Sequence, residues 1–111
     1  MYWYLPFFKK QLYKKARDKW GDLQILLLFE EMAELQKALI KNMRYLTSKH
    51  NLLWPSHKTK VENMRFEIIE ELADVQIMLE QMTLIFGEKE VAAAIEKKIE
   101  RLEELVNIKV R

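Results

Sequence analysis

Two stretches of the sequence each carry a pair of carboxylates spaced three residues apart. The first pair is Glu31 and Glu34, and the second is Glu71 and Asp74. Residues with this spacing lie about one turn apart on the same side of an α-helix. Ligand sets made only of oxygen select hard cations, and Mg²⁺ or Mn²⁺ suits four carboxylates of this kind. The spacing therefore predicts a divalent metal site between two helices that pack antiparallel.

The residues around both pairs are apolar, which is unusual for acids that only solubilise a surface. Steps of about 100° per residue place Glu34 on a stripe that is otherwise apolar, made of Leu23, Leu27 and Ala38. The acids of the later stretch share one sector that Met78 and Ile85 continue; these acids are Glu67, Glu70, Glu71 and Asp74. Partly buried carboxylates that repel one another need a positive charge nearby, and a bound divalent ion supplies it.

A di-iron centre of the ferritin type is the main alternative for acids on neighbouring helices. Such a centre requires Glu-x-x-His on two of its helices. The two histidines of the chain, His50 and His57, flank a loop and are assigned no role. We therefore favour Mg²⁺ over iron.

Four helices are expected to position these residues. Gly21 and Asp22 separate a basic first helix from a second that runs from Leu23 to about Lys49. After a loop at residues 51–56, a third helix extends to Phe86, and a fourth follows Gly87 from about residue 88 to 107. The prediction is a single all-α domain over residues 1–111, with an apolar N-terminal arm at 1–8. It is four-helix bundle-like, with the long second and third helices packed antiparallel.

Composition agrees with this fold and excludes several classes. The 111 residues include two Gly and two Pro, too few for the turns of an all-β chain of this size. The longest uninterrupted run of aliphatic and aromatic residues has five members, at 25–29, far below the roughly 20 residues of a spanning helix, so no membrane is expected as a partner. A net charge of +2 does not indicate binding to a nucleic acid polymer. The absence of Cys excludes a thiolate metal site and suits a reducing, cytoplasmic location, and no targeting segment is expected.

The start of the second helix predicts a partner subunit. Residues 23–29 are apolar on nearly every side of the helix, and such a helix is usually buried all round. A chain this short rarely buries one helix on every face by itself. We therefore expect a homo-oligomer, either a dimer or a tetramer.

At the acidic pairs the chain resembles a known family. Glu30-Glu31-Met32-Ala33-Glu34 followed by Glu71-Leu72-Ala73-Asp74 is similar to the E-E-x-x-E … E-x-x-D signature of the all-α nucleoside triphosphate pyrophosphohydrolases. The likeness is to the MazG-like group found in phages and prophages, and it extends from about Trp20 to Leu105. The 36 residues between Glu34 and Glu71 form a longer interval than is usual between these motifs, which extra helical turns and the loop would absorb.

This resemblance implies an enzyme that cleaves a nucleoside triphosphate between its α- and β-phosphates. The products would be the monophosphate and pyrophosphate. The resemblance assigns Mg²⁺, or Mn²⁺, to four ligands: Glu31, Glu34, Glu71 and Asp74. It adds Glu30 as a further catalytic acid that orients the ligands or helps to activate water.

A triphosphate also needs fixed positive charges. Lys37 and Lys41 lie one and two turns past Glu34 on the flank of the second helix. On the fourth helix Lys98 and Arg101 lie one turn apart, and the resemblance favours them as phosphate contacts.

Two other functions remain open at this point. The chain can be a non-catalytic interaction module whose partner surfaces are the arm 1–8 and the apolar seam 91–105, with its acids paired to lysines. Alternatively, the basic first helix can attach the chain to an anionic membrane surface or to a nucleic acid.

Overall fold

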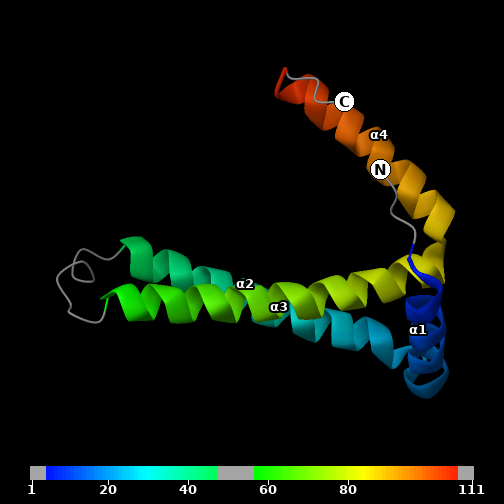
Figure 1. The fold of residues 1–111 in the computed structure, drawn as a ribbon, viewed down its shortest axis with the longest axis horizontal. Coiled ribbons are helices and arrows are strands. Elements are labelled where there is room, and N and C mark those ends of the chain that lie inside the picture. Colours follow the sequence, from blue (N-terminus) through cyan, green and yellow to red (C-terminus); the bar gives the residue numbers. More distant parts are fainter. Residues whose placement is uncertain (1–4, 48–56, 108–111) are drawn as a thin grey trace.

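The computed structural model describes residues 5–47 and 57–107. These residues form four helices: α1 (Phe7–Trp20), α2 (Leu23–Thr47), α3 (His57–Phe86) and α4 (Glu88–Leu105), as Figure 1 shows. Within these two ranges there is no strand, so the predicted all-α class is confirmed. The expected loop at 51–56 and the first four residues of the apolar arm lie outside the described ranges.

The breaks between helices lie at the two glycines that the sequence indicates. Gly21 ends α1 with φ 55°, and its N–H donates to the carbonyl of Arg17 at 2.7 Å. Gly87 separates α3 from α4 with φ 126° and ψ 109°. That second conformation is open almost only to glycine, because a Cβ would collide with the backbone. The direction in which α4 leaves α3 therefore depends on this one residue.

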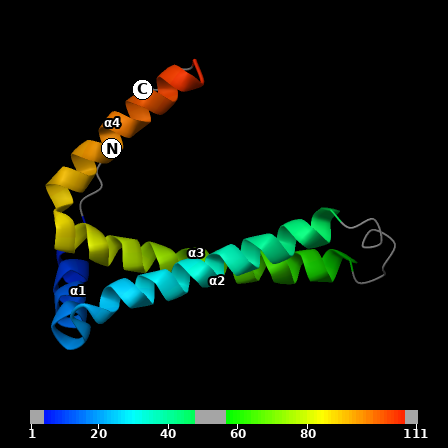
Figure 2. The ribbon, with the colours of Figure 1, turned by 180° about the vertical axis from the view of Figure 1, so that it is seen from behind.

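The long helices α2 and α3 lie side by side and run in opposite directions, as Figures 1 and 2 show from opposite sides. This confirms the predicted antiparallel pair. Their contact buries four apolar side chains, namely Ala38 from α2 and Met64, Val75 and Met78 from α3. It also buries Gln24 and Gln81, where the Nε2–H of Gln24 donates to Oε1 of Gln81.

Polar contacts attach α1 to the opposite end of the pair from the loop. The hydroxyl of Tyr13 donates to Glu80 at 2.8 Å, and the Lys9 ammonium lies 3.1 Å from the same carboxylate. Burial, together with the hydrogen bond and charge of Glu80, raises the pKa of Tyr13 to about 12. Glu88, at the start of α4, accepts from the backbone N–H of Leu5 and pairs with Lys10 at 2.9 Å. Two cations of α1 thus point into ion pairs.

Beyond its first turns α4 leaves the other helices. Figures 1 and 2 both show α4 projecting away from the α2–α3 pair. The radius of gyration is 18.3 Å, against about 13 Å for a compact chain of this length. One copy therefore forms a packed pair of helices with α1 across one end, and α4 does not close the predicted bundle.

The prediction that residues 23–29 are buried all round is not met within one chain. Leu23, Leu26 and Phe29 are each more than half exposed, because the packing of α1 and α3 against α2 leaves these side chains uncovered. None of the described helices is both long and apolar enough to span a membrane.

Replacing Gly21 or Gly87 with Ala is expected to destabilise the fold. Gly21 has φ 55° and ψ −132°, and Gly87 has φ 126° and ψ 109°, so both glycines have backbone conformations that residues with a Cβ rarely adopt. Each alanine should therefore cost about 1–3 kcal/mol. Urea unfolding of both variants measures the loss, and an unchanged stability in either variant would contradict it.

The ionised form of Glu88 is expected to contribute stability at neutral pH. Burial opposes its ionisation, but the Leu5 N–H and the Lys10 ammonium outweigh burial and lower the pKa below 4.5. A folded-state pKa below the unfolded one gives a contribution that is complete above 4.5 and is lost as pH falls through the folded value. Glu88→Gln should therefore unfold about 1 kcal/mol more easily at neutral pH and match the parent in strong acid. Thermal melts across this pH range test it, and a gap that persists in acid would exclude the ionised contact as its cause.

Candidate metal centre

Three of the predicted ligands meet where α2 crosses α3. Glu31 comes from α2, and Glu71 and Asp74 come from α3, one helical turn apart. One carboxylate oxygen from each lies within 4.8 Å of the others. The antiparallel packing produces this meeting, because it places the first acidic pair level with the second.

The three carboxylates oppose one another's ionisation. Burial first, and then the charges of Asp74 and Glu71, raise the pKa of Glu31, which also shares a hydrogen bond with Asp74. Burial and the charges of Asp74, Glu34, Glu67 and Glu70 raise the pKa of Glu71. Among the described residues, no lysine or arginine forms an ion pair with any of the three. The centre therefore gathers negative charge without a protein cation to balance it.

One oxygen of the centre also lacks a hydrogen-bond partner. The Oε2 atom of Glu71 is buried and receives no hydrogen bond from the described part of the chain. A buried acceptor without a donor is unfavourable. A divalent cation would provide a partner for this oxygen and would also offset the repulsion among the three carboxylates. A ligand set made only of carboxylates suits Mg²⁺ or Mn²⁺. The residues present thus fit the ion that the sequence predicts.

The other two predicted acids lie outside the trio. Glu34 is exposed, and its oxygens are not among the group within 4.8 Å. Its charge still raises the pKa of both Glu31 and Glu71, so it lies beside the centre. Helical geometry gives the reason, because Glu34 is rotated about 60° from Glu31 around α2. Glu30 is exposed and takes no part in the group.

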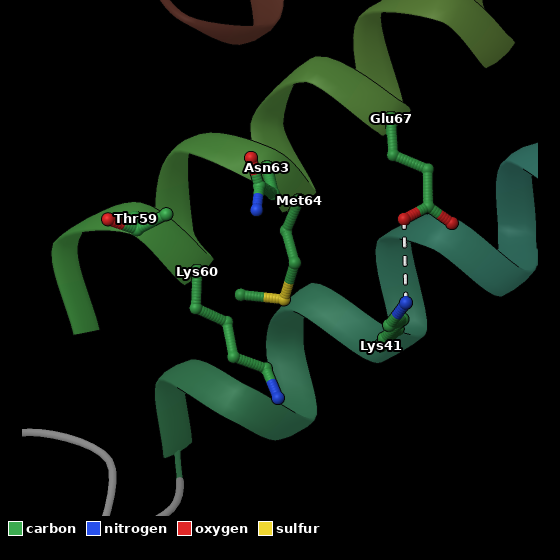
Figure 3. A pocket seen from close by; sticks show the side chains of 6 residues that line it. All are labelled: Lys41, Thr59, Lys60, Asn63, Met64 and Glu67. Carbon is green, nitrogen blue, oxygen red and sulfur yellow. Dashed lines mark hydrogen bonds and ion pairs between the residues drawn. The ribbon is translucent and has the colours of Figure 1, made fainter. Parts of the chain in front are cut away.

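Cations lie next to the centre on the side towards the loop. Lys41 pairs with Glu67 at 3.5 Å, and Glu67 is one turn from Glu71. Figure 3 shows this pair at the edge of a pocket of about 310 Å³ between α2 and α3. The pocket is lined by Lys41, Thr59, Lys60, Asn63, Met64 and Glu67. A second hollow of about 550 Å³, on α2 itself, includes Lys37, Lys41 and Arg44.

Lys60 is a residue of this region that the sequence pattern does not single out. Its ammonium lies 5.2 Å from the ring centre of Tyr45, which stacks on His57. Lys60 belongs to α3, and only the register of α3 against α2 brings it close to Lys41. An antiparallel register drawn from the two acidic pairs would have placed residue 60 opposite residue 45.

The two predicted phosphate contacts of α4 are not brought to the acids of their own chain. Lys98 and Arg101 are exposed and belong to the second half of α4, which diverges from the α2–α3 pair in Figures 1 and 2. The physical cause is the Gly87 break, after which α4 has no long contact with α2.

The metal-free protein should become less stable as pH rises above 4.5. Because the pKa values of Glu31 and Glu71 are raised, the folded chain holds more protons than the unfolded chain between 4.5 and the raised values. Glu71→Gln should raise metal-free stability at neutral pH and flatten this dependence, whereas Glu62→Gln, on an exposed part of α3, should change neither.

In the parent, Mg²⁺ at 100 times its Kd should add about 2.7 kcal/mol to the free energy of unfolding. Melts in chelator and in Mg²⁺ measure both effects, and a parent that ignores Mg²⁺ would contradict the metal assignment.

Comparison of the chain with family models, with curated proteins and with solved structures finds no match in any of the three. The functional argument therefore depends on the residues and their geometry.

Proposed function

We propose that this chain is a Mg²⁺-dependent nucleoside triphosphate pyrophosphohydrolase of the MazG-like kind. It would convert an NTP or dNTP to the monophosphate and pyrophosphate. The observation that carries the proposal is the meeting of Glu31 with Glu71 and Asp74, an uncompensated group of carboxylates that includes a buried oxygen without a partner. These residues come from the two segments that resemble the motifs of that family.

Each acid has a role in the proposal. Glu31, Glu71 and Asp74 hold the ion, and Glu34 beside them provides a further ligand on the exposed side. When bound, Mg²⁺ neutralises phosphate charge, polarises the attacked phosphorus and lowers the pKa of a coordinated water. Glu30, or another of the acids, would orient the attacking water and accept its proton. The water oxygen would bond to one of the two phosphorus atoms of the α–β bridge while that phosphorus loses its bond to the bridging oxygen, and the monophosphate and pyrophosphate would separate.

The cations around the centre bind the rest of the triphosphate. Lys37 and Lys41 are on the same helix as Glu34. Lys41 lines the pocket that Glu67 borders, and both lysines line the hollow on α2. Lys98 and Arg101 would contact phosphate only if α4 of one chain reached the acidic centre of another chain. The proposal therefore includes a homo-oligomer, dimer or tetramer, in which α4 of one copy serves another. The expected location is the cytoplasm, where nucleotides are made and used.

A non-catalytic helical interaction module is the second function that an observation favours. Large apolar side chains are exposed along all four helices, including Phe8, Phe29, Phe66 and Leu102. Such surfaces mark sites of protein contact. In that case Mg²⁺ would bind weakly or not at all, and the acids would only limit non-specific association.

Asp74→Asn is expected to abolish turnover and to preserve the fold. The amide keeps the shape of the side chain but removes a negative ligand, so pyrophosphate release should fall at least about 100-fold. The parent, Asp74→Asn and the control Glu62→Gln would be incubated with each NTP and dNTP and Mg²⁺. Circular dichroism would check the helices. A parent that releases no pyrophosphate from any nucleotide would end the proposal, and an active Asp74→Asn would remove this residue from it.

A further inference from the structure

A basic cavity of about 210 Å³ lies where α1 meets α2 and α3. On the α1 side it is lined by three cations, Lys10, Lys14 and Arg17. On the other side it is lined by the amides of Gln24 from α2 and Gln81 from α3, together with two apolar side chains of α3. No aspartate or glutamate of the described ranges belongs to the lining. The cavity therefore combines positive charge with buried hydrogen-bonding groups.

Two of the three cations have no anionic partner within the described part of the chain. Lys10 pairs with Glu88 at 2.9 Å, but Lys14 and Arg17 form no ion pair with any residue of 5–47 or 57–107. Lys14 lies one turn past Lys10 on α1, and Arg17 lies about one turn further, so the three side chains follow one stripe of the helix. A ligand in the cavity therefore meets two positive charges that these residues do not neutralise.

The acid beside this cavity is already compensated. The hydroxyl of Tyr13, which also lines the cavity, donates to Glu80 at 2.8 Å. The ammonium of Lys9 lies 3.1 Å from the same carboxylate. Because Lys9 offsets its charge, Glu80 does not replace an external anion at the cavity.

The two amides of the lining have hydrogen-bonding capacity that the chain does not use. Gln24 is a fully buried side chain, only 1% exposed. Its Nε2–H donates to Oε1 of Gln81, but its own Oε1 is buried and has no hydrogen-bond partner in the described ranges. The Nε2–H of Gln81 donates to the sulfur of Met78 at 3.5 Å, and a thioether is a weak acceptor. A buried acceptor without a donor is unfavourable, and a ligand with an O–H or N–H group would relieve this.

A phosphate group matches these features of the cavity. Its negative charge suits Lys14 and Arg17, and a guanidinium can donate two parallel N–H bonds to two phosphate oxygens. A phosphate that retains a proton also has an O–H group, which can donate to Oε1 of Gln24. A neutral ligand such as a nucleobase would instead leave both cations without a partner. Charge therefore favours phosphate as the occupant.

The cavity is separate from the acidic centre. Gln24 precedes Glu31 by seven residues on α2, which corresponds to about 10 Å along the helix. Gln81 follows Asp74 by the same interval on α3. The two places also have opposite charge, since the acidic centre gathers carboxylates and the cavity gathers cations. An anion in the cavity therefore needs no metal ion to hold it.

We propose that this cavity is a phosphate-binding site formed by Lys14 and Arg17 of α1 and the amide of Gln24. The phosphate is either inorganic phosphate or the phosphate of a monoester such as a nucleoside monophosphate. When bound, it joins α1 to α2 close to the contact that Tyr13 makes with Glu80. The site requires neither the metal ion nor nucleotide hydrolysis. A chain that hydrolyses no nucleotide would therefore leave the proposal intact, and an active chain that binds no phosphate here would overturn it alone.

Titration calorimetry of the metal-free protein tests the site, with inorganic phosphate as the probe. Arg17→Gln should weaken phosphate binding at least about tenfold, because it removes charged hydrogen bonds. Lys15→Gln is the matched control, since it removes one positive charge from the same helix but lies about 160° around it from Arg17 and outside the lining. This control should bind phosphate as the parent does. Sulfate, which has a similar shape but no proton at neutral pH, should bind the parent at least about tenfold more weakly than phosphate.

A second variant tests the amide. Gln24→Glu places a carboxylate against the phosphate and should abolish binding. If circular dichroism shows that this variant loses its helices, Arg17→Gln against Lys15→Gln still decides the question.

Two further ligands identify the source of the phosphate. A nucleoside monophosphate that binds the parent more tightly than inorganic phosphate, and that Arg17→Gln weakens, would assign the site to a phosphomonoester. Weaker binding of the monophosphate would assign it to free phosphate. An uncharged nucleoside that binds as tightly as its monophosphate would overturn the proposal in favour of a nucleobase. A parent that binds no phosphate at millimolar concentration, an Arg17→Gln variant that binds like the parent, or equal binding of sulfate would also overturn it.

Discussion

The antiparallel contact between α2 and α3 is the constraint on which the rest of this structure depends. It places acids from two distant segments at the same level, and it does so in a region that is partly removed from water. Glu31, Glu71 and Asp74 raise one another's cost of ionisation because no protein cation in the described ranges pairs with them. Apolar contacts of Ala38, Met64 and Val75 on either side hold the helices together against this repulsion. The apolar packing therefore holds like charges close together although they repel one another. A cation site requires this arrangement.

The polar anchors of α1 have the opposite character. Glu80 and Glu88 each accept hydrogen bonds and face a lysine, so these carboxylates are compensated where the acidic centre is not. The presence or absence of a lysine partner therefore distinguishes the acids that attach helices to one another from the acids of the candidate metal centre. Lys9 and Lys10, two of the six cations of α1, are thus engaged with α3 and α4.

Particular residues show which features of the structure could be predicted from the sequence and which could not. The helix breaks at Gly21 and Gly87 and the pairing of α2 with α3 were predictable, because glycine and apolar periodicity act locally. Glu34 was predicted as an equal ligand, yet it lies beside the trio, because a rotation of about 60° around the helix decides which carboxylate faces α3. The buried pair of Gln24 and Gln81 and the position of Lys60 were not foreseen. Each follows from the register of α3 against α2, which the two acidic pairs give only when they are read together, because spacing within one helix does not contain it.

The sequence by itself determined an all-helical chain, its two acidic pairs and an excess of apolar surface over what one copy can bury, since these follow from residue type and spacing along each helix. Tertiary structure alone decided which three carboxylates converge and which oxygen of that group is left without a donor. It also decided that α4 leaves its own chain, carrying Lys98 and Arg101 away from the acids. The reason is that register and rotation between helices arise from the packing of many side chains together. The backbone conformation at Gly87 then determines the direction of α4.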